Sequence, residues 1–102
     1  MKVELLHWRG CPSTDEAREL LDLVLAERGG GDEVVMREVR TEDEAAALGF
    51  PGSPTIRVDG ADVDPAGATG HSRLTCRIYH VDGRASPVPS REQLEAALGG
   101  GT

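Results

Sequence analysis

Residues 5–14 read LLHWRGCPST and join an apolar run to a stretch with helical periodicity. The run from Lys2 to Trp8 is mostly apolar, which is typical of a buried central strand. After Cys11 the apolar residues recur at the spacing of one helix face: Ala17, Leu20, Leu21, Val24 and Leu25. The sequence therefore predicts that Cys11 lies at a strand-to-helix junction, near the positive end of a helix dipole, where a thiolate is stabilised.

A second stretch, residues 52–56, reads GSPTI and places a proline at the start of another apolar run. One interpretation is an ordinary proline at the first position of a strand. The other is a special turn with a cis bond between Ser53 and Pro54 that faces Cys11. The cysteine upstream favours the second interpretation, because the two stretches together indicate a thiol redox site.

The rest of the chain predicts further strands and helices. The strands are expected at Glu33–Arg40, Thr55–Val58 and Leu74–Val81, and the helices at Thr41–Gly49 and about Arg91–Leu98. Capping boxes support the helix starts: Ser13 with Glu16, Thr41 with Glu44, and Ser90 with Gln93. The element order is then βαβαββα. This is an α/β (α+β) arrangement in which a four-stranded mixed sheet, with a parallel first pair and an antiparallel edge, is flanked by helices.

Length and charge limit the function classes. The 102 residues are expected to form one domain, residues 1–102, with residues 99–102 as a flexible tail. The net charge of −7 opposes binding to nucleic acid or to an anionic membrane surface. We recognise no signal peptide and no membrane-spanning run, so a cytoplasmic protein is expected. Two cysteines are too few for a disulfide scaffold or a four-cysteine zinc site, and Asp59, Asp62 and Asp64 are interpreted as solvated acids, so no metal site is predicted.

The element order and the two motifs resemble the thioredoxin fold, and the GCP and GSPT stretches are similar to those of small bacterial thioredoxin-family proteins. In that superfamily the first cysteine of a CxxC motif is the nucleophile, and a cis-proline that begins the third core strand lies against it. Cys11 and Pro54 match these two positions. Thr14 stands where a dithiol enzyme has its resolving cysteine, so this chain has CPST in place of CxxC. The resemblance covers nearly the whole chain.

The candidate site is centred on Cys11 as the catalytic nucleophile, with the Thr14 hydroxyl hydrogen-bonded to its sulfur. The alternative is that Cys11 is a small packed residue at a tight turn. Ser53 and Pro54 are expected to position the substrate, Ser53 through its backbone groups. Trp8 either forms a wall of the site or covers the edge of the sheet.

Cys76 is the second cysteine, and its neighbours predict a different environment. It alternates with polar residues along Leu74–Val81, on the same side as Leu74 and Ile78, which predicts a buried position on the apolar face of a strand. The alternative is that Cys76 reaches Cys11 and resolves a disulfide formed there, which the sequence spacing leaves open.

These observations predict a monothiol-type thiol–disulfide oxidoreductase or thiol-transfer protein that acts on protein or small-molecule thiols and disulfides. Cys11 would form a mixed disulfide with glutathione as co-substrate, or with a protein, and an external thiol would release it. No other cofactor is expected. Two alternatives are non-catalytic modules of the same fold: one binds a soft metal ion through thiolates, and the other binds a protein partner.

Overall fold

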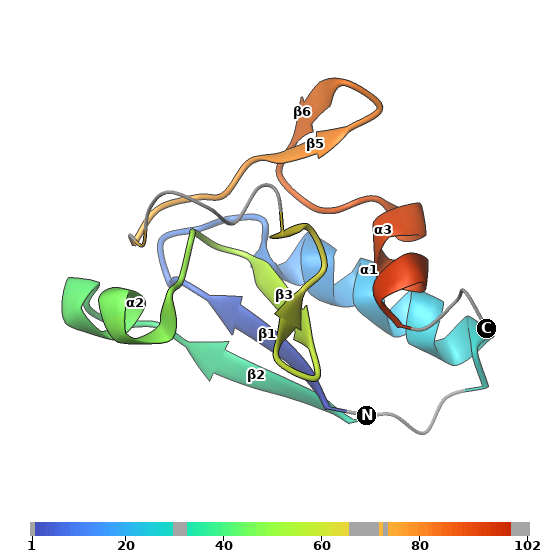
Figure 1. The fold of residues 1–102 in the computed structure, drawn as a ribbon, viewed down its shortest axis with the longest axis horizontal. Coiled ribbons are helices and arrows are strands. Elements are labelled where there is room, and N and C mark those ends of the chain that lie inside the picture. The colour runs from blue at the N-terminus through green and yellow to red at the C-terminus, as the bar shows by residue number, and fades with distance from the viewer. Residues whose placement is uncertain (1, 30–32, 66–71, 73, 99–102) are drawn as a thin grey trace.

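The computed structural model describes residues 2–29, 33–65, 72 and 74–98 and has a mixed α/β fold. One sheet has the strand order β2-β1-β3-β4, and β1 is parallel to β2 and antiparallel to β3 (Figure 1). In that order the strands are Val34–Glu38, Val3–His7, Thr55–Val58 and Ala61–Asp62. The predicted four-stranded mixed sheet is therefore confirmed, but the predicted element order βαβαββα is wrong, because the described residues have the order βαβαββββα. The expected tail at 99–102 lies outside the described residues.

The first strand connects the two apolar layers of the molecule. The helices in the described residues are α1 (Thr14–Glu27), α2 (Glu42–Leu48) and α3 (Arg91–Ala97). Val3 and Leu5 belong to the larger core, which includes buried residues of α1 and α3, whereas Leu6 belongs to a smaller core with Ala45 of α2. This division follows from the strand geometry, because successive side chains point to opposite faces of a sheet. Burying each leucine is worth about 1.5–3 kcal/mol relative to exposure, so β1 stabilises both layers.

The structure confirms the caps at two of the predicted helix starts. The Thr41 hydroxyl accepts a hydrogen bond from the amide of Glu44 at 3.0 Å, and Ser90 and Gln93 form a complete capping box. The capping box predicted at Ser13 is wrong, because its backbone is already helical (φ −92°, ψ 0°) and its side chain makes no capping hydrogen bond. A capping side chain needs an extended backbone to reach back to the free amides, so Ser13 precedes α1 without capping it.

The fourth strand of the sheet is not the predicted one. The sequence predicts Leu74–Val81 at this place, but the edge strand is β4, and Tyr79–Val81 (β5) pairs with Arg84–Ser86 (β6) in a separate hairpin (Figure 1). Asp59-Gly60 and Asp82-Gly83 form the turns of the two hairpins, with positive φ at every one of these residues. Each Asp-Gly pair thus joins two neighbouring strands, and both pairings are local in the sequence.

Residues 76–79 are also oriented opposite to the prediction. Alternation predicts Cys76 and Ile78 on the buried face, but both are exposed, whereas Arg77 and Tyr79 are buried. Tyr79 belongs to the larger core, and Arg77, which is 3% exposed, forms an ion pair with Asp62. The prediction of a buried Cys76 is therefore wrong, because an aromatic ring and an ion pair fill the interior here in place of the aliphatic side chains.

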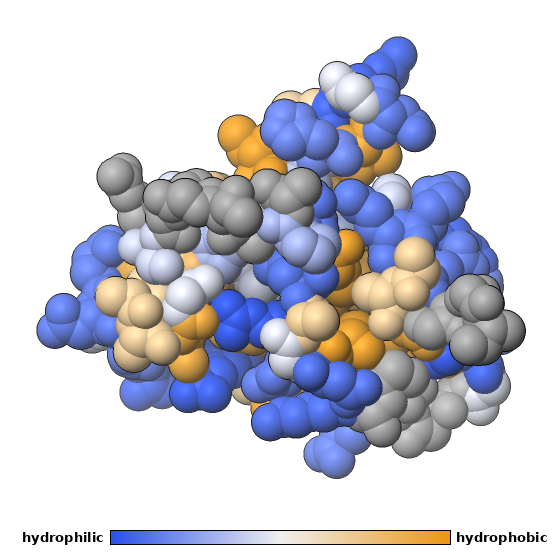
Figure 2. All heavy atoms as spheres, in the orientation of Figure 1, coloured by the Kyte–Doolittle hydropathy of each residue, from blue (hydrophilic) through white to orange (hydrophobic). Residues whose placement is uncertain are grey.

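The surface visible in Figure 2 is mostly hydrophilic, with apolar residues gathered at the β5–β6 hairpin, beside α3 and over α2. Among the large apolar side chains of the described residues, Ile78 is the most exposed, at 60%. Within the described ranges, none of the helices has the length and hydrophobicity that a membrane-spanning segment needs. The two cysteines lie near the carboxyl end of β1 and the amino end of β3, where the segment before β5 passes the sheet (Figure 1).

Candidate thiol site

A tight turn at the end of β1 carries the first cysteine. The amide of Cys11 donates to the carbonyl oxygen of Trp8 at 3.0 Å, and the amide of Trp8 donates to the hydroxyl of Ser53 at 2.9 Å. The indole ring of Trp8 packs over Gly10, where a Cβ would lie 2.7 Å from two ring carbons. Only a residue without a side chain fits under the ring, so Gly10 and Trp8 together fix the loop that leads to Cys11.

The sulfur of Cys11 faces the turn at Ser53 and Pro54, as the sequence predicts. The Cys11 thiol is 8% exposed and donates a hydrogen bond to the carbonyl oxygen of Ser53 at 3.3 Å. The Ser53–Pro54 bond is cis, which confirms the expectation from the GSPT stretch. Two segments far apart in the sequence are thus brought together, with the thiol between them.

Ser53 is completely buried, and both of its backbone polar groups are used inside the chain. Its amide donates to the carbonyl oxygen of Thr75 at 2.7 Å, and its carbonyl oxygen accepts from the amide of Arg77 at 2.8 Å in addition to the Cys11 thiol. From the sequence, these groups are expected to position a substrate. In the structure, residues 75–77 occupy them instead, because this segment runs alongside Ser53 and forms a parallel bridge at Cys76.

Cys76 lies beside Cys11, although the sequence leaves that contact open. Its pKa is raised, first by desolvation and then by a side-chain hydrogen bond with Cys11 and by the charge of Cys11. The shared acceptor supports the same placement, because the Ser53 carbonyl oxygen accepts from both the Cys11 thiol and the amide that follows Cys76. Both cysteines are free thiols. The structure therefore forms a pair of neighbouring thiols, one nearly covered and one exposed.

Thr14 does not make the expected hydrogen bond. Its hydroxyl oxygen is buried, and within the described part of the chain it has no hydrogen-bond partner. The Cys11 thiol turns instead toward Ser53 on the opposite segment. The predicted stabilisation of the sulfur by the Thr14 hydroxyl is therefore wrong for this conformation, and Thr14 contributes to the wall of a pocket.

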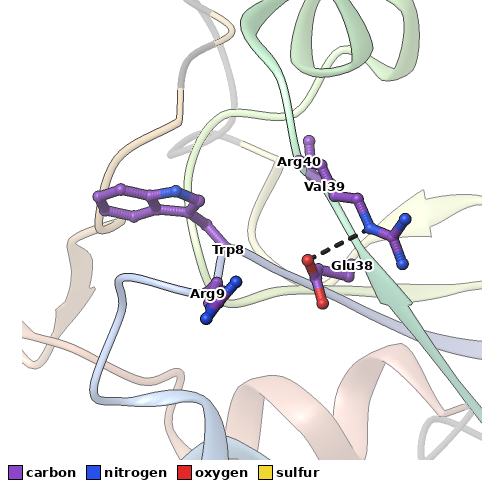
Figure 3. A pocket seen from close by; sticks show the side chains of 5 residues that line it. All are labelled: Trp8, Arg9, Glu38, Val39 and Arg40. Atoms are coloured by element: carbon purple, nitrogen blue, oxygen red, sulfur yellow. Dashed lines mark ion pairs between the residues drawn. The ribbon is translucent and has the colours of Figure 1, made fainter.

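Two neighbouring pockets open next to Trp8 and Arg9. The first, of about 350 Å³, is lined by the loop from Trp8 to Asp15, including Cys11, with His7 and Met36 at its sides. The second, of about 470 Å³, lies between Trp8 and Arg9 on one side and the end of β2 on the other, where Glu38 and Arg40 form an ion pair at 3.3 Å (Figure 3). Trp8 thus lines both pockets, and it also packs against the smaller core.

The anchor that holds the segment of Cys76 was not predicted from the sequence. Arg77 donates to both carboxylate oxygens of Asp62, at 2.7 and 2.8 Å, and to the carbonyl oxygen of Asp64 at 2.8 Å. Its guanidinium group lies 4.2 Å from the ring centre of Tyr79. Burial alone would lower the pKa of Arg77, but the hydrogen bond with Asp62 and the neighbouring charges raise it above its ordinary value. Interpreting Asp62 as a solvated acid is therefore wrong, since its carboxylate is 10% exposed.

Among the described residues, no group of three or more histidine, cysteine or acidic side chains is placed to hold a metal ion. Comparison with protein families, with curated protein sequences and with solved structures finds no match to this chain.

Proposed function

We propose that this protein is a thiol–disulfide oxidoreductase with a thioredoxin-like fold, in which Cys11 is the nucleophile and Cys76 the resolving thiol. The observation that carries the proposal is the meeting of Cys11 with the Ser53–Pro54 turn and with a second free thiol. The strand order β2-β1-β3-β4, with α1 and α3 packed on one face and α2 on the other, supports the fold part of the proposal.

The proposed reaction is a two-step thiol exchange. The Cys11 thiolate attacks one sulfur of a substrate disulfide, forms a mixed disulfide and releases the other sulfur as a thiolate. The Cys76 thiolate then attacks the Cys11 sulfur, releases the remaining substrate thiolate and forms a Cys11–Cys76 disulfide. The substrate gains two electrons and two protons overall, and an external thiol pair such as two glutathione molecules returns the protein to its dithiol form. The proposed route differs from the monothiol route expected from the sequence, because Cys76, which is bridged to Ser53 beside Cys11, takes the role of the external thiol.

Access to the nucleophile decides which disulfides react. Cys11 is only 8% exposed, and it lines the pocket of about 350 Å³ together with Trp8 and Arg9. A substrate disulfide therefore has to bring one sulfur into this pocket, which suits a small disulfide such as oxidised glutathione or an extended, accessible disulfide of a protein. A disulfide inside a compact domain would not reach the sulfur of Cys11.

Trapping with oxidised glutathione tests the proposal. In Cys76→Ser the mixed disulfide at Cys11 has no resolving thiol, so we expect a stable glutathione adduct whose site is located by peptide mass spectrometry. The unsubstituted chain should instead lose the adduct and gain an internal disulfide, while Cys11→Ser should form neither product at position 11. The proposal is wrong if Cys76→Ser, although folded, forms no adduct under conditions in which the denatured chain does.

A second candidate function rests on the same pair of thiols. Two adjacent thiolates are suitable ligands for a soft ion such as copper(I) or mercury(II), so the module could bind a metal without redox turnover. Titration with copper(I) distinguishes the two functions when the unsubstituted chain is compared with a chain carrying both Cys11→Ser and Cys76→Ser. Tight binding lost in the double variant, without glutathione adducts in Cys76→Ser, would favour metal binding.

A further inference from the structure

We propose that Arg77 is a positioning residue, which locks residues 75–77 along Ser53 in the manner of a bound peptide and thereby holds Cys76 against Cys11. The inference deepens the proposed function, because it assigns the element that makes Cys76 an effective resolving thiol. It concerns the placement of Cys76, and its test is separate from the test of whether Cys11 attacks an external disulfide.

The backbone of residues 75–77 is paired on both sides of Cys76. Thr75 accepts from the Ser53 amide at 2.7 Å, and Arg77 donates to the Ser53 carbonyl oxygen at 2.8 Å. This is the pairing by which an extended peptide adds to an exposed backbone edge, and here the chain supplies the peptide itself. The bridge places Cys76 at the centre of the pairing, directly opposite Ser53.

Arg77 is the residue that fixes this segment to the rest of the fold. Its planar guanidinium group binds the Asp62 carboxylate through two parallel hydrogen bonds, a geometry that tolerates little rotation. A third hydrogen bond reaches the carbonyl oxygen of Asp64, and a weaker one of 3.3 Å reaches the Thr55 hydroxyl. Because Arg77 immediately follows Cys76, this anchor limits how far the exposed thiol can move. At the other end, the amide of Leu74 donates to the Glu42 carboxylate at 3.2 Å.

Gly52 provides an independent sign that the close approach is built into the fold. Its φ is +139°, and a Cβ at this position would lie 3.0 Å from the Cβ of Arg77 and 3.1 Å from the Cα and the amide nitrogen of Arg77. Any side chain at residue 52 would therefore push residues 75–77 away from Ser53. The absence of a side chain at residue 52 therefore permits the close approach of residues 75–77, which the sequence motif alone does not reveal.

A fixed thiol has a higher effective concentration than a thiol on a loose loop. Flexibly tethered groups reach about the millimolar range, whereas rigidly oriented groups exceed it by orders of magnitude. Loosening the anchor should therefore weaken the Cys11–Cys76 disulfide against glutathione without altering either sulfur chemically. The reaction that measures this takes one oxidised glutathione, forms the internal disulfide and releases two reduced glutathione molecules.

The test equilibrates the full chain with mixtures of reduced and oxidised glutathione and quantifies the internal disulfide after acid quenching. We expect Arg77→Met to lower the effective concentration of the thiol pair by about tenfold or more. Arg77→Lys should give a value between those of Arg77→Met and the unsubstituted chain, because lysine keeps the positive charge but cannot form the two parallel hydrogen bonds of the guanidinium group. Val24→Ala, in the core of α1, is the matched control: it destabilises the fold but should leave the effective concentration unchanged.

Two further variants keep the inference testable if Arg77→Met does not fold. Asp62→Asn retains the shape of the partner but removes its charge, and Gly52→Ala leaves Arg77 intact while displacing its backbone. Both should lower the effective concentration. The inference is overturned if the folded variants match the unsubstituted chain in effective concentration. An unsubstituted chain that forms no internal disulfide contradicts the resolving role of Cys76 in the proposed function as well, and an unreactive Cys11 in Cys76→Ser contradicts the role of Cys11 as nucleophile.

Discussion

The two thiols differ in exposure. Cys76 is exposed, yet its pKa is raised, first by desolvation and then by the hydrogen bond and the charge of Cys11. Cys11 is nearly covered and faces the carbonyl oxygen of Ser53. A raised pKa lowers the thiolate fraction at neutral pH, so exposure alone does not make Cys76 the faster nucleophile. These properties suit a sulfur that attacks only after a disulfide has formed beside it.

Removing Cys11 should make Cys76 easier to ionise. In Cys11→Ala the hydrogen bond and the charge that raise the pKa of Cys76 are both lost, while desolvation remains. We expect alkylation of Cys76 by iodoacetamide at pH 8 to become roughly two- to tenfold faster, since one pKa unit corresponds to tenfold in thiolate below the pKa. The rate is measured at Cys76 by peptide mass spectrometry across the pH range.

The control for this experiment is Leu23→Ala, an exposed side chain of α1 that should leave the rate as it is. An unchanged or slower alkylation of Cys76 in Cys11→Ala would contradict the described contact between the two side chains. The midpoint of the pH profile is the informative quantity, because deleting a neighbour that merely shields Cys76 would also speed alkylation through accessibility, but without moving the midpoint.

Each helix begins with a different local structure, although all three starts carry the same sequence signal. Ser90 and Gln93 exchange side-chain and backbone hydrogen bonds at the start of α3, whereas Ser13 at the start of α1 makes no such bond. The loop before α1 is instead shaped by the turn from Trp8 to Cys11 and by the contact with Ser53. The same sequence pattern, a hydroxyl residue followed three positions later by Glu or Gln, therefore forms a capping hydrogen bond only where the backbone of the hydroxyl residue is extended.

This contrast predicts unequal effects of two similar substitutions. Ser90→Ala should lower the free energy of unfolding by about 0.5–2 kcal/mol, because the amide of Gln93 loses its partner. Ser13→Ala should change it by less than about 0.5 kcal/mol, as is usual for a side chain without a specific contact. Urea denaturation followed by circular dichroism measures both values. Equal losses in the two variants would argue against the described difference in capping.

At the scale of the whole molecule, Tyr79 connects the larger core to the thiol site. It is completely buried, its hydroxyl donates to the carbonyl oxygen of Pro54 at 2.6 Å, and its ring contacts the Arg77 guanidinium group. Burial raises the pKa of Tyr79 well above its ordinary value of 10.0, and Arg77 offsets only part of this shift. The folded chain therefore keeps the phenol proton at a pH at which the unfolded chain has lost it.

The sign of the resulting pH effect follows from the number of bound protons. Below the ordinary pKa of 10.0 both states hold the proton, so the contribution of Tyr79 to stability is complete. As the pH rises further, only the unfolded state loses its proton, and stability falls with a slope of up to about 1.4 kcal/mol per pH unit. We expect the urea midpoint to drop between pH 10 and pH 12, and the absorbance of the single tyrosine to report ionisation together with unfolding.

Tyr79→Phe isolates this effect from the titration of other groups. The variant should be less stable at pH 8, because the Pro54 carbonyl oxygen loses its donor, at a cost of about 1–3 kcal/mol. Its stability should then change less with pH than that of the unsubstituted chain, so the difference between the two narrows above pH 10. Parallel curves over the whole range would contradict a buried, hydrogen-bonded phenol.

Local patterns in the sequence determined much of the architecture. Apolar periodicity predicted β1, α1 and the four-stranded mixed sheet, and the motif at residues 52–56 predicted the cis bond and the meeting of Pro54 with Cys11. These features depend on neighbours within a few residues or on backbone chemistry, so a short stretch carries enough information. The two Asp-Gly pairs likewise indicated the turns of the two hairpins, although the predicted strands were too long for the hairpins to be recognised.

Only the tertiary structure decided which face of residues 74–79 is buried and where the second thiol lies. An alternating sequence pattern gives a strand two faces, and the aliphatic face is normally expected to be buried. Here Arg77 is buried instead, because the Asp62 carboxylate neutralises its charge. That partner lies on β4, 15 residues earlier in the chain, and nothing in the local sequence identifies it. The orientation of Arg77 turns Cys76 outward and sets it beside Cys11, so the pairing of the thiols depends on one long-range ion pair that no local pattern encodes.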